Sequence, residues 1–494
     1  MKLLLLALAA AATAPAGDSL AEAIAKNRTG TVVIKAAPGT RVSLEQVRHE
    51  FWFGATLPNG VFNGRMPAEA AERFQQIFLA NFNAAVVENA FKWHDMEPQR
   101  GNVNYTTVDN ALEWASRNGI PVRGHCIFWG IPNRVQEWLK VLPDAELRSA
   151  LQERGRTVGA RFRGRFAEYD LNNEMMHANY YEQRLGEGIT KEMALWVKEG
   201  DPNAKLFVND YDITTGRRLD DYVKHIRKLV EAGVPVAGIG VQGHLHRDEF
   251  DPAMLQKALD DLSVFGLPIR ITEFNMPGQR SKFYSGDRTA KMTIEEERAK
   301  AENLRKFYRI CFAHPAVTGI MMWGFWEGAN WIPQSSLYAR DWMPTPALDY
   351  YRRLTRDEWW TRWSGTADAS GTVTVKAFYG THRVTVDGKS RMVKLTREQR
   401  ASRSRPLTKR RRYTEQNPVT AFQIHKCYNR CYTSEQWLAN PRRRLPVRRS
   451  PRRRPVGSRF WRGASSPRAP AVCRAGRIRS GLRRVSSGGL PSLR

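Results

Sequence analysis

Two glutamates stand out because each closes a short run of β-type residues. Glu174 ends the segment YDLNNE, and Glu273 lies in the segment IRITEF. Two facing carboxyl groups are the minimum that retaining hydrolysis of a glycosidic bond requires, one as acid/base and the other as nucleophile. Such a pair must stand about 5 to 5.5 Å apart. The prediction therefore depends on a fold that brings these two distant positions together.

Eight short apolar runs alternate with stretches of helical spacing between residues 50 and 355. The runs lie at residues 51–57, 84–89, 121–128, 167–174, 204–210, 236–244, 268–274 and 316–324. Eight strands that alternate with helices over this length predict an α/β fold, a (β/α)8 TIM barrel. No glycine-rich phosphate loop follows the first run, which argues against a doubly wound dinucleotide-binding sheet.

Polar or aromatic residues follow the carboxyl ends of seven runs, where the loops of a barrel build its active face. They are Glu88, Asn89, His125, Trp129, Asn173, Glu174, Asn209, Asp210, Gln242, His244, Glu273, Asn275 and Trp323. Any one of them, taken alone, is more often a structural hydrogen-bonding group than a catalyst. Because they recur in register, we expect them to form one site.

Seven segments resemble the motif series of glycoside hydrolase family 10, the (β/α)8 endo-β-1,4-xylanases. In order they are VENAFKWHDMEP, RGHCIFW, NNE, FVNDYD, IGVQGHL, ITEFN and MMWGFWEGANW. The resemblance covers roughly residues 50–355. It implies that Glu174 is the acid/base, that Glu273 is the nucleophile, that configuration is retained and that β-1,4-xylan is the substrate. No cofactor and no metal ion are expected.

These roles require opposite protonation of the two glutamates. In the free enzyme Glu174 must hold a proton while Glu273 is ionised. Two nearby carboxyls in a sheltered cleft split their titration, because the first negative charge disfavours the second. Once Glu273 is esterified to the sugar its charge vanishes, so Glu174 becomes more acidic and can act as a base toward water.

The resemblance also implies substrate-binding residues around the pair. Asn173 is similar to the asparagine that binds the sugar 2-hydroxyl, and His244 to the histidine that orients the nucleophile. The other expected substrate-binding residues are Glu88, Asn89, Lys92, His125, Trp129, Tyr211, Gln242, Trp323 and Trp331. Sugar rings stack on flat side chains, so we expect Trp129, Trp323 and Trp331 to wall the cleft and Tyr211 to stack on the leaving-group side.

Some alternatives stay open. His125 and His244 could be ordinary interior polar groups, and Lys92 could be a surface lysine. Gly130 stands where the family often has histidine, and the last loop carries Glu327 and Asn330. These departures concern the outer subsites and not the reaction.

The positive charge of the chain is concentrated in its C-terminal part. The formal net charge is +29, yet residues 1–400 contribute only +6 of it. Residues 397–494 are rich in arginine, proline and serine and lack periodicity, so we expect a disordered tail and hypothesise a non-native extension. Cys427 and Cys431 near His425 lack a second pair and are a weak metal signal. We expect no nucleic-acid partner.

The remaining segments complete the predicted organisation. Residues 1–16 combine one lysine, a short Leu/Ala run and small residues, which predicts a signal peptide and a secreted or periplasmic protein without a membrane span. Residues 17–50 are predicted as a β-rich lead-in, residues 51–355 as the catalytic barrel and residues 356–396 as a small β appendage. A monomer with xylan or xylo-oligosaccharide as its partner is expected. The alternatives are a retaining hydrolase of another β-1,4-glycan, a non-catalytic carbohydrate-binding barrel and, more weakly, a basic module acting on nucleic acid.

Overall fold

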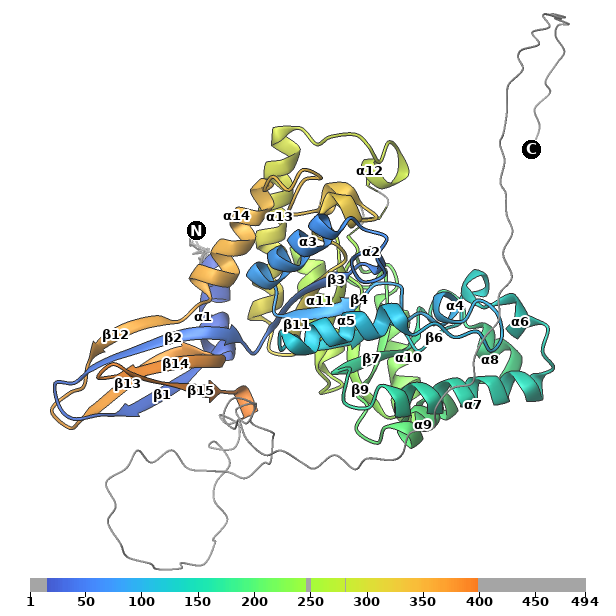
Figure 1. Ribbon diagram of the computed structural model, residues 1–494, viewed down its shortest axis with the longest axis horizontal. Helices are drawn as coiled ribbons and strands as arrows, with labels where there is room; N and C mark the ends of the chain where they lie inside the picture. The colour runs from blue at the N-terminus through green and yellow to red at the C-terminus, as the bar shows by residue number, and fades with distance from the viewer. Residues whose placement is uncertain (1–15, 246–249, 280, 399–494) are drawn as a thin grey trace, which may run out of the picture. The chain divides into compact units, whose positions relative to one another are not determined.

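Eight parallel strands close into a barrel in the computed structural model, which describes residues 16–245, 250–279 and 281–398 (Figure 1). The strands are β3 (Trp52–Leu57), β4 (Ala84–Val87), β5 (Val122–Gly124), β7 (Glu168–Asn173), β8 (Leu206–Asp210), β9 (Val236–Val241), β10 (Ile269–Phe274) and β11 (Val317–Met322). Each pairs with its sequence neighbours, β11 pairs with β3, and β5 pairs with β7. The predicted TIM barrel is confirmed.

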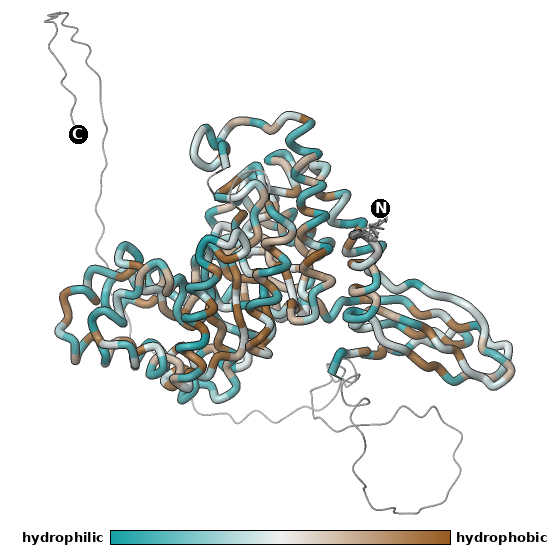
Figure 2. The backbone as a smooth tube through the Cα atoms, turned by 180° about the vertical axis from the view of Figure 1, so that it is seen from behind, coloured by the Kyte–Doolittle hydropathy of each residue, from teal (hydrophilic) through white to brown (hydrophobic). Residues whose placement is uncertain are grey.

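The barrel strands are apolar because they are covered on both faces. All residues of β8 and all residues of β10 are buried. A parallel strand is covered by packed side chains inside the barrel and by helices outside it. Because neither face meets solvent, its sequence does not alternate between apolar and polar residues. Figure 2 shows this as hydrophobic colour along the central strands and more hydrophilic colour along the outer helices.

The third predicted strand, residues 121–128, is divided in the structure. β5 ends at Gly124, and the short strand β6 (Phe128–Trp129) resumes the pairing with β7. At Gly124 the ring of Tyr169 comes within 2.8 Å of the place where a Cβ would stand, so a larger residue would clash with this ring. The prediction of one continuous strand was wrong, and the interruption carries His125 out of the sheet register.

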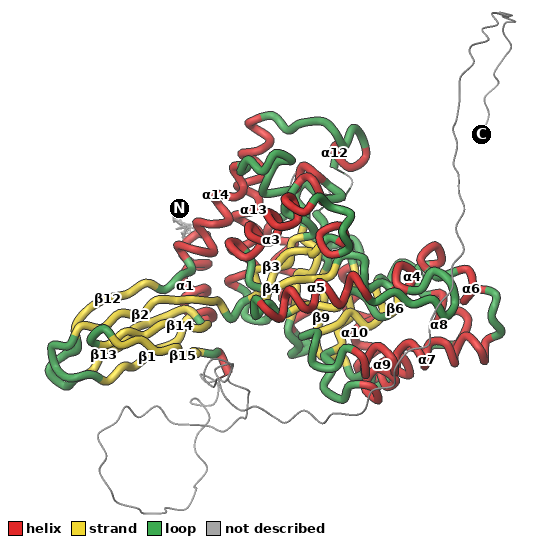
Figure 3. Tube along the Cα trace, in the orientation of Figure 1, coloured by secondary structure: helices red, strands yellow, loops and turns green. Residues whose placement is uncertain are grey.

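Helices surround the strands (Figure 3). The longer ones are α3 (Ala68–Asn81), α5 (Thr106–Arg117), α7 (Asp144–Arg161), α9 (Ile189–Gly200), α10 (Leu219–Glu231), α11 (Pro252–Ser263), α13 (Ile294–Ala313) and α14 (Pro346–Arg352). Shorter helices are α2 (Asn59–Phe62), α4 (Trp93–Met96), α6 (Glu137–Lys140), α8 (Tyr180–Leu185) and α12 (Lys282–Ser285). Single turns lie at Pro132–Arg134, Glu327–Ala329 and Pro333–Ser335, and a π-helix spans Arg353–Glu358. A capping box of Thr293 and Glu296 starts α13.

The segments before and after the barrel form one β module rather than two separate pieces. β1 (Thr29–Lys35) pairs antiparallel with β13 (Thr372–Phe378). β2 (Arg41–His49) lies between β12 (Arg362–Thr366) and β14 (Gly380–Val386), and β15 (Lys389–Leu395) completes the second sheet. A small core of its own fills this module, with Val42, Leu44, Val373, Val375 and Val384. The lead-in and the appendage were predicted as β-rich, but their mutual pairing was not.

The first described element contradicts the prediction of a β lead-in that begins at residue 17. Residues 16–28 form helix α1 (Ala16–Arg28), which packs on α13. Leu20, Ala23 and Ile24 have the spacing of one helical face and contact the barrel core. The Arg28 guanidinium donates to the carbonyls of His314 (2.6 Å) and Val317 (2.8 Å), which ties the end of α1 to the start of β11.

Two predicted segments lie outside the described residues. They are nearly all of the signal peptide, residues 1–16, and nearly all of the tail, residues 397–494, with Cys427, Cys431 and His425. None of the helices that the structure describes is both long and apolar enough to cross a bilayer.

Candidate active site

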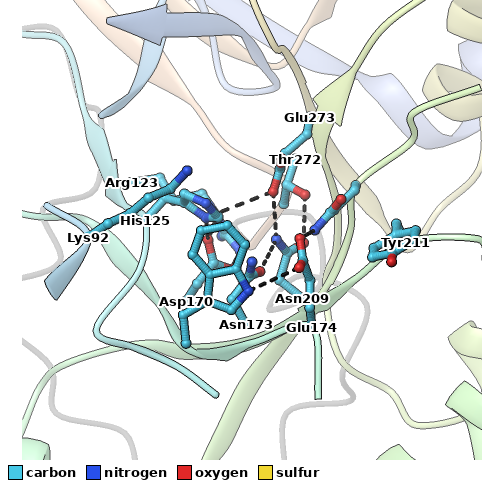
Figure 4. Close-up of polar contacts among 12 residues, drawn as sticks. Lys92, Arg123, His125, Asp170, Asn173, Glu174, Asn209, Tyr211, Thr272 and Glu273 are labelled. Atoms are coloured by element: carbon cyan, nitrogen blue, oxygen red, sulfur yellow. Dashed lines mark hydrogen bonds and ion pairs between the residues drawn. The ribbon is translucent and has the colours of Figure 1, made fainter. Parts of the chain in front are cut away.

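The two glutamates lie together at the carboxyl-terminal end of the barrel. Glu174 follows β7 directly, and its backbone N–H donates to the carbonyl of Asn209 (2.9 Å). Glu273 lies within β10, and its N–H donates to the carbonyl of Gln242 (2.7 Å). Figure 4 shows the two carboxyl groups approaching each other, with Asn209 beside them. The fold therefore brings the two predicted catalytic positions to one place.

The backbone at Glu174 is in the left-handed region, with φ 59°. For a residue with a Cβ this conformation costs about 1 kcal/mol. It turns the chain out of β7 immediately, so that the Glu174 side chain points across the mouth of the barrel. Unfavourable backbone conformations of this kind concentrate at functional sites.

Glu174 is half-buried, and each of its carboxyl oxygens accepts one fixed hydrogen bond. Trp129 Nε1 donates to Oε2 (3.0 Å), and Gln242 Nε2 donates to Oε1 (2.8 Å). Burial raises the pKa of Glu174, and the negative charge of Glu273 raises it further, while these two hydrogen bonds oppose the shift. Since burial prevails, Glu174 keeps a proton to a higher pH than an ordinary glutamate.

Glu273 is buried but surrounded by donors and positive charge. Asn209 Nδ2 donates to Oε1 (2.9 Å), His244 Nε2 lies 3.1 Å from Oε2, and His125 Nδ1 lies 3.8 Å from Oε1. Burial alone would raise the pKa of Glu273, but the charge of His125, the His244 hydrogen bond and Lys92 together outweigh it and lower that pKa to about 2. There is therefore a pH range in which Glu273 is ionised while Glu174 is still protonated.

Asn275 fixes the orientation of His244. The amide Nδ2 of Asn275 donates to the Trp323 carbonyl (3.1 Å) and to Ser335 Oγ (2.8 Å), so its Oδ1 must be the acceptor side. That oxygen accepts from Trp331 Nε1 (2.8 Å) and lies 2.9 Å from His244 Nδ1, which therefore carries a proton. His244 Nε2 is left to face Glu273.

A buried donor is left open beside the acid/base. Asn173 Oδ1 accepts from Asn209 Nδ2 (3.0 Å), but Asn173 Nδ2 is buried and makes no hydrogen bond with the residues that the structure describes. Because a buried donor without a partner is costly, this N–H group is placed for a group that a ligand supplies. A sugar hydroxyl fits that requirement.

Lys92 is buried, with only 8% of its surface exposed, which does not fit the alternative of a surface lysine. Its Nζ lies over the rings of Trp129 (4.8 Å to the centroid) and Trp323 (5.6 Å), and it donates to Asn89 Oδ1 (2.8 Å). Glu88 is half-buried next to this group, and burial raises the pKa of Glu88. The predicted Glu88, Asn89 and Lys92 cluster is therefore assembled.

His125 contacts both the site and a buried charge cluster inside the barrel. Its Nδ1 lies 2.9 Å from Asp170 Oδ2, and Asp170 is held in turn by the Arg123 guanidinium. The edge of the His125 ring meets Trp323, with centroids 5.0 Å apart. His125 is thus an interior hydrogen-bonding group and a neighbour of Glu273 at the same time.

The remaining aromatic residues line the same end of the barrel. Trp331 meets the His244 ring edge-on at 5.0 Å. The Tyr211 ring is stacked parallel to His177, with centroids 3.5 Å apart. Trp129 differs from the expected free stacking wall, because Lys92 and Arg134 both lie over its ring.

The departure at Gly130 has a structural reason. A Cβ at this position would stand 3.0 Å from Asn179 Oδ1 and 3.2 Å from the backbone nitrogen of Tyr180. The Gly130 carbonyl accepts a hydrogen bond from that nitrogen (2.8 Å). The loop after the acid/base therefore occupies the space that a histidine side chain would need.

Three residues with clear structural roles at the site were not among the residues predicted to be catalytic or substrate-binding. Asn209 bridges Glu273 and Asn173, Asn275 orients His244, and Asp170 binds His125. Asn209 and Asn275 were recognised as polar residues at strand ends, which is the signal that could have found them. In the described part of the chain no group of His, Cys, Asp and Glu is arranged to hold a metal ion, and Cys126 and Cys311 are buried free thiols.

Comparisons with known proteins identify relatives of this chain. The sequence profile of the family described as Glycosyl hydrolase family 10 matches residues 44–353. The anti-sigma-I factor RsgI6 of Acetivibrio thermocellus is 37% identical over 377 residues, which make up 75% of this chain and 46% of that protein. Endo-1,4-beta-xylanase 1 of Arabidopsis thaliana is 34% identical over 352 residues, 70% of this chain and 34% of that protein. The chain thus spans less than half the length of these two relatives.

Solved structures show the same fold. Native xylanase 10B from Thermotoga maritima superposes with a TM-score of 0.56 at 26% identity, covering 63% of this chain and 96% of that one. Xylanase 10B from Thermotoga petrophila RKU-1 in complex with xylobiose gives a TM-score of 0.55 at 26% identity, covering 63% and 95%.

Proposed function

This chain belongs to glycosyl hydrolase family 10, and we propose that it is an endo-1,4-β-xylanase that cleaves β-1,4-xylosidic bonds with retention of configuration. The observation that carries the proposal is the opposite shift of two neighbouring carboxyls. The pKa of Glu174 is raised by burial and by the charge of Glu273, and the pKa of Glu273 is lowered to about 2. A proton donor next to an ionised nucleophile is what the first step of retaining hydrolysis requires.

In the first step Glu273 attacks the anomeric carbon while Glu174 protonates the departing glycosidic oxygen. Asn209 contacts Oε1 of Glu273 and His244 contacts Oε2, so the nucleophile enters the reaction in one orientation. Trp129 and Gln242 donate to Glu174 and stabilise the carboxylate that remains after its proton has left. The products are a glycosyl ester of Glu273 and a shortened xylan chain.

In the second step the ester is hydrolysed. Esterification removes the negative charge of Glu273, and with it one of the causes that raise the pKa of Glu174. Glu174 is then ionised and takes a proton from water, which attacks the anomeric carbon from the side that the first product has left. Glu273 departs as a carboxylate, and Glu174 regains the proton that it needs for the next cycle.

The xylan assignment is supported by the relatives. Endo-1,4-β-xylanases share 34% identity with this chain, and the Thermotoga petrophila structure is a complex with xylobiose. Product analysis tests it. Linear xylohexaose should give shorter oligosaccharides whose new reducing ends are first β, as followed by proton NMR. An α product would overturn retention, and faster hydrolysis of cello-oligosaccharides than of xylohexaose would overturn the substrate.

A second experiment separates the two roles. A 2-fluoro xylobioside with a good leaving group should label Glu273, and mass spectrometry of the peptides should locate the label there. Glu174→Ala should lose activity on xylan but keep the first step on an aryl xylobioside whose leaving group needs no proton. A label on Glu174 instead would reverse the assignment.

Export is a further part of the proposal. The lysine, the short Leu/Ala run and the small residues of segment 1–16 support a cleaved signal peptide. Expression with and without residues 1–16 in a bacterial host, with xylanase activity measured in the periplasm and cytoplasm, tests this. Equal distribution of both forms would rule it out.

A further inference from the structure

We infer that Arg134 is a binding residue for a carboxylate on the substrate, so that the enzyme prefers xylan chains bearing uronic-acid side groups next to the cleaved bond. This inference rests on the proposed function and concerns the surroundings of the same two glutamates. Arg134 ends the single turn Pro132–Arg134, which follows β6 and the Trp129 side of the site. Arg134 was not among the residues predicted from the sequence to bind the substrate.

The position of Arg134 is defined by Trp129. The Arg134 guanidinium carbon lies 5.0 Å from the centroid of the Trp129 ring. The same indole donates through Nε1 to Glu174 Oε2 at 3.0 Å. Arg134 is therefore one aromatic side chain away from the acid/base, within reach of a substituent on a xylosyl unit beside the scissile bond.

The charge of Arg134 is not used within the protein. Its side chain is exposed, and it forms no ion pair and no hydrogen bond with another residue in the described part of the chain. Two other arginines are engaged within the protein: Arg154 donates to the carbonyls of Ile127 and Phe91, and Arg184 donates to that of Leu142. A guanidinium held over an indole, with its N–H groups free, is preorganised for an outside acceptor.

Two cationic side chains, Lys92 and Arg134, lie against the Trp129 ring. Lys92 lies over the same indole, and the His94 ring lies 5.7 Å from it. The segment after β4 also carries the acidic residues Glu88, Asp95 and Glu97, and Asp95 Oδ1 is 3.6 Å from His94 Nε2. Burial lowers the pKa of His94, and the charges of Lys92 and Arg134 act in the same direction, so His94 adds no positive charge at neutral pH. The cations beside this indole are therefore Lys92 and Arg134.

The chemistry of the substrate identifies the acceptor. The xylan backbone is a chain of neutral pentoses and offers no partner for a guanidinium beyond hydroxyls. Uronic acids are the substituents of such chains that carry a carboxylate, which matches the fork of a guanidinium with two parallel hydrogen bonds. Neutral pentose substituents would leave the Arg134 charge without a partner.

Defined oligosaccharides test the inference. The substrates are linear xylohexaose, the same backbone with one uronic-acid substituent, and the methyl ester of that substituent, which keeps the shape and removes the charge. For the unmodified protein we expect kcat/KM on the acid to exceed that on the ester by about tenfold, the effect of one charge-assisted hydrogen bond. In Arg134→Gln the acid-to-ester ratio should fall to about one, and Arg134→Lys should restore part of it.

The ratio also separates charge recognition from structural support. If Arg134 only steadies Trp129, the variants change hydrolysis of acid and ester alike, and an unchanged ratio overturns the inference. Arg73→Gln is the matched control, because exposed Arg73 lies over the Trp342 ring at 5.5 Å and should keep the ratio. Raised salt should lower the ratio in the unmodified protein and not in Arg134→Gln. Absence of any hydrolysis of linear xylohexaose would instead contradict the proposed function.

Discussion

Two clusters of charged side chains lie in the same barrel and are partnered in different ways. Inside the barrel, toward the amino-terminal ends of the strands, Arg123, Arg270, Glu168 and Asp170 are buried together. Every oxygen of the two carboxylates there accepts from a guanidinium. At the opposite end no guanidinium of the described residues contacts Glu174 or Glu273, and within the same residues the donor Asn173 Nδ2 has no partner.

The difference shows how one fold keeps a charge cluster that stabilises the barrel apart from a carboxyl pair that can react. In the lower cluster burial acts to raise the pKa of Glu168, but Arg270 and Arg123 outweigh it and lower that pKa, so the group stays charged and passive. In the upper pair the pKa of Glu174 moves up while that of Glu273 moves down. Complete pairing stabilises the scaffold, and incomplete pairing leaves groups that a substrate can engage.

Glu273→Gln is expected to give the largest effect. The amide cannot attack the anomeric carbon, so kcat on xylan should fall by about 10⁴-fold or more. Binding of xylo-oligosaccharides, measured by calorimetry, should persist because the rest of the cleft is unchanged. Full activity in this variant would contradict the assignment of the nucleophile.

The same variant also tests the electrostatics of the upper pair. The pKa of Glu273 is lowered from 4.5 to about 2 in the folded protein, so its ionised form stabilises the fold above pH 4.5, and this contribution is lost as the pH falls toward 2. Acid unfolding should therefore show a loss of stability between pH 4.5 and 2 that is smaller in Glu273→Gln. An identical pH dependence in the two proteins would contradict the lowered pKa.

In the lower cluster Arg123→Met should act on stability. The change leaves Asp170 buried without its guanidinium, and breaking a buried ion pair on one side costs about 3 to 5 kcal/mol. Urea unfolding measures the free energy. Arg117→Met is the control, because the exposed pair of Arg117 with Glu113 should contribute at most about 0.5 kcal/mol. Equal losses in the two variants would mean that the cluster is not a desolvated network.

Arg270→Met should cost less than Arg123→Met. Glu168 keeps its contact with Arg123 when Arg270 is removed, so the loss of unfolding free energy is expected at about 1 to 3 kcal/mol. The double variant should deviate from the sum of the single losses, since both arginines share Glu168. Strict additivity would show that they act separately.

The smallest expected effect concerns pH. Gln242 donates to Glu174, and this hydrogen bond lowers the pKa of Glu174 against the upward effect of burial. In Gln242→Leu that pKa should rise, so the alkaline limb of the kcat/KM profile should move to higher pH while kcat/KM itself decreases. Gln256→Leu is the control, because the half-buried Gln256 lies on helix α11 and donates to Asp260 Oδ1 (3.0 Å) instead of a site residue. A limb that moves to lower pH would contradict the proposed contact.

The barrel and the upper pair could be predicted from the sequence because both depend on local signals. Buried parallel strands appear as apolar runs, and functional residues follow their ends, as Asn173 and Glu174 do after β7. The division between β5 and β6 could not be predicted, because nothing in the run 121–128 marks residues 125–127 as lying outside a strand.

Contacts between residues that are distant in the sequence could not be predicted in the same way. That Asn209 contacts Glu273, or that Arg134 lies over Trp129, depends on which strand ends and turns meet in three dimensions. The pairing of β1 with β13 joins residues more than three hundred positions apart, and no local pattern encodes it. By contrast, the spacing of Leu20, Ala23 and Ile24 is a local signal in the sequence that indicates the helical face of α1.

The shared β module has a consequence for synthesis on the ribosome. β1 and β2 emerge early, yet their partners β12, β13 and β14 are translated only after the whole barrel. Until then the nascent chain carries two strands with open edges, which are templates for association with other chains. A message truncated after α14 would release a polypeptide whose barrel segment is complete but whose first strands never find their partners.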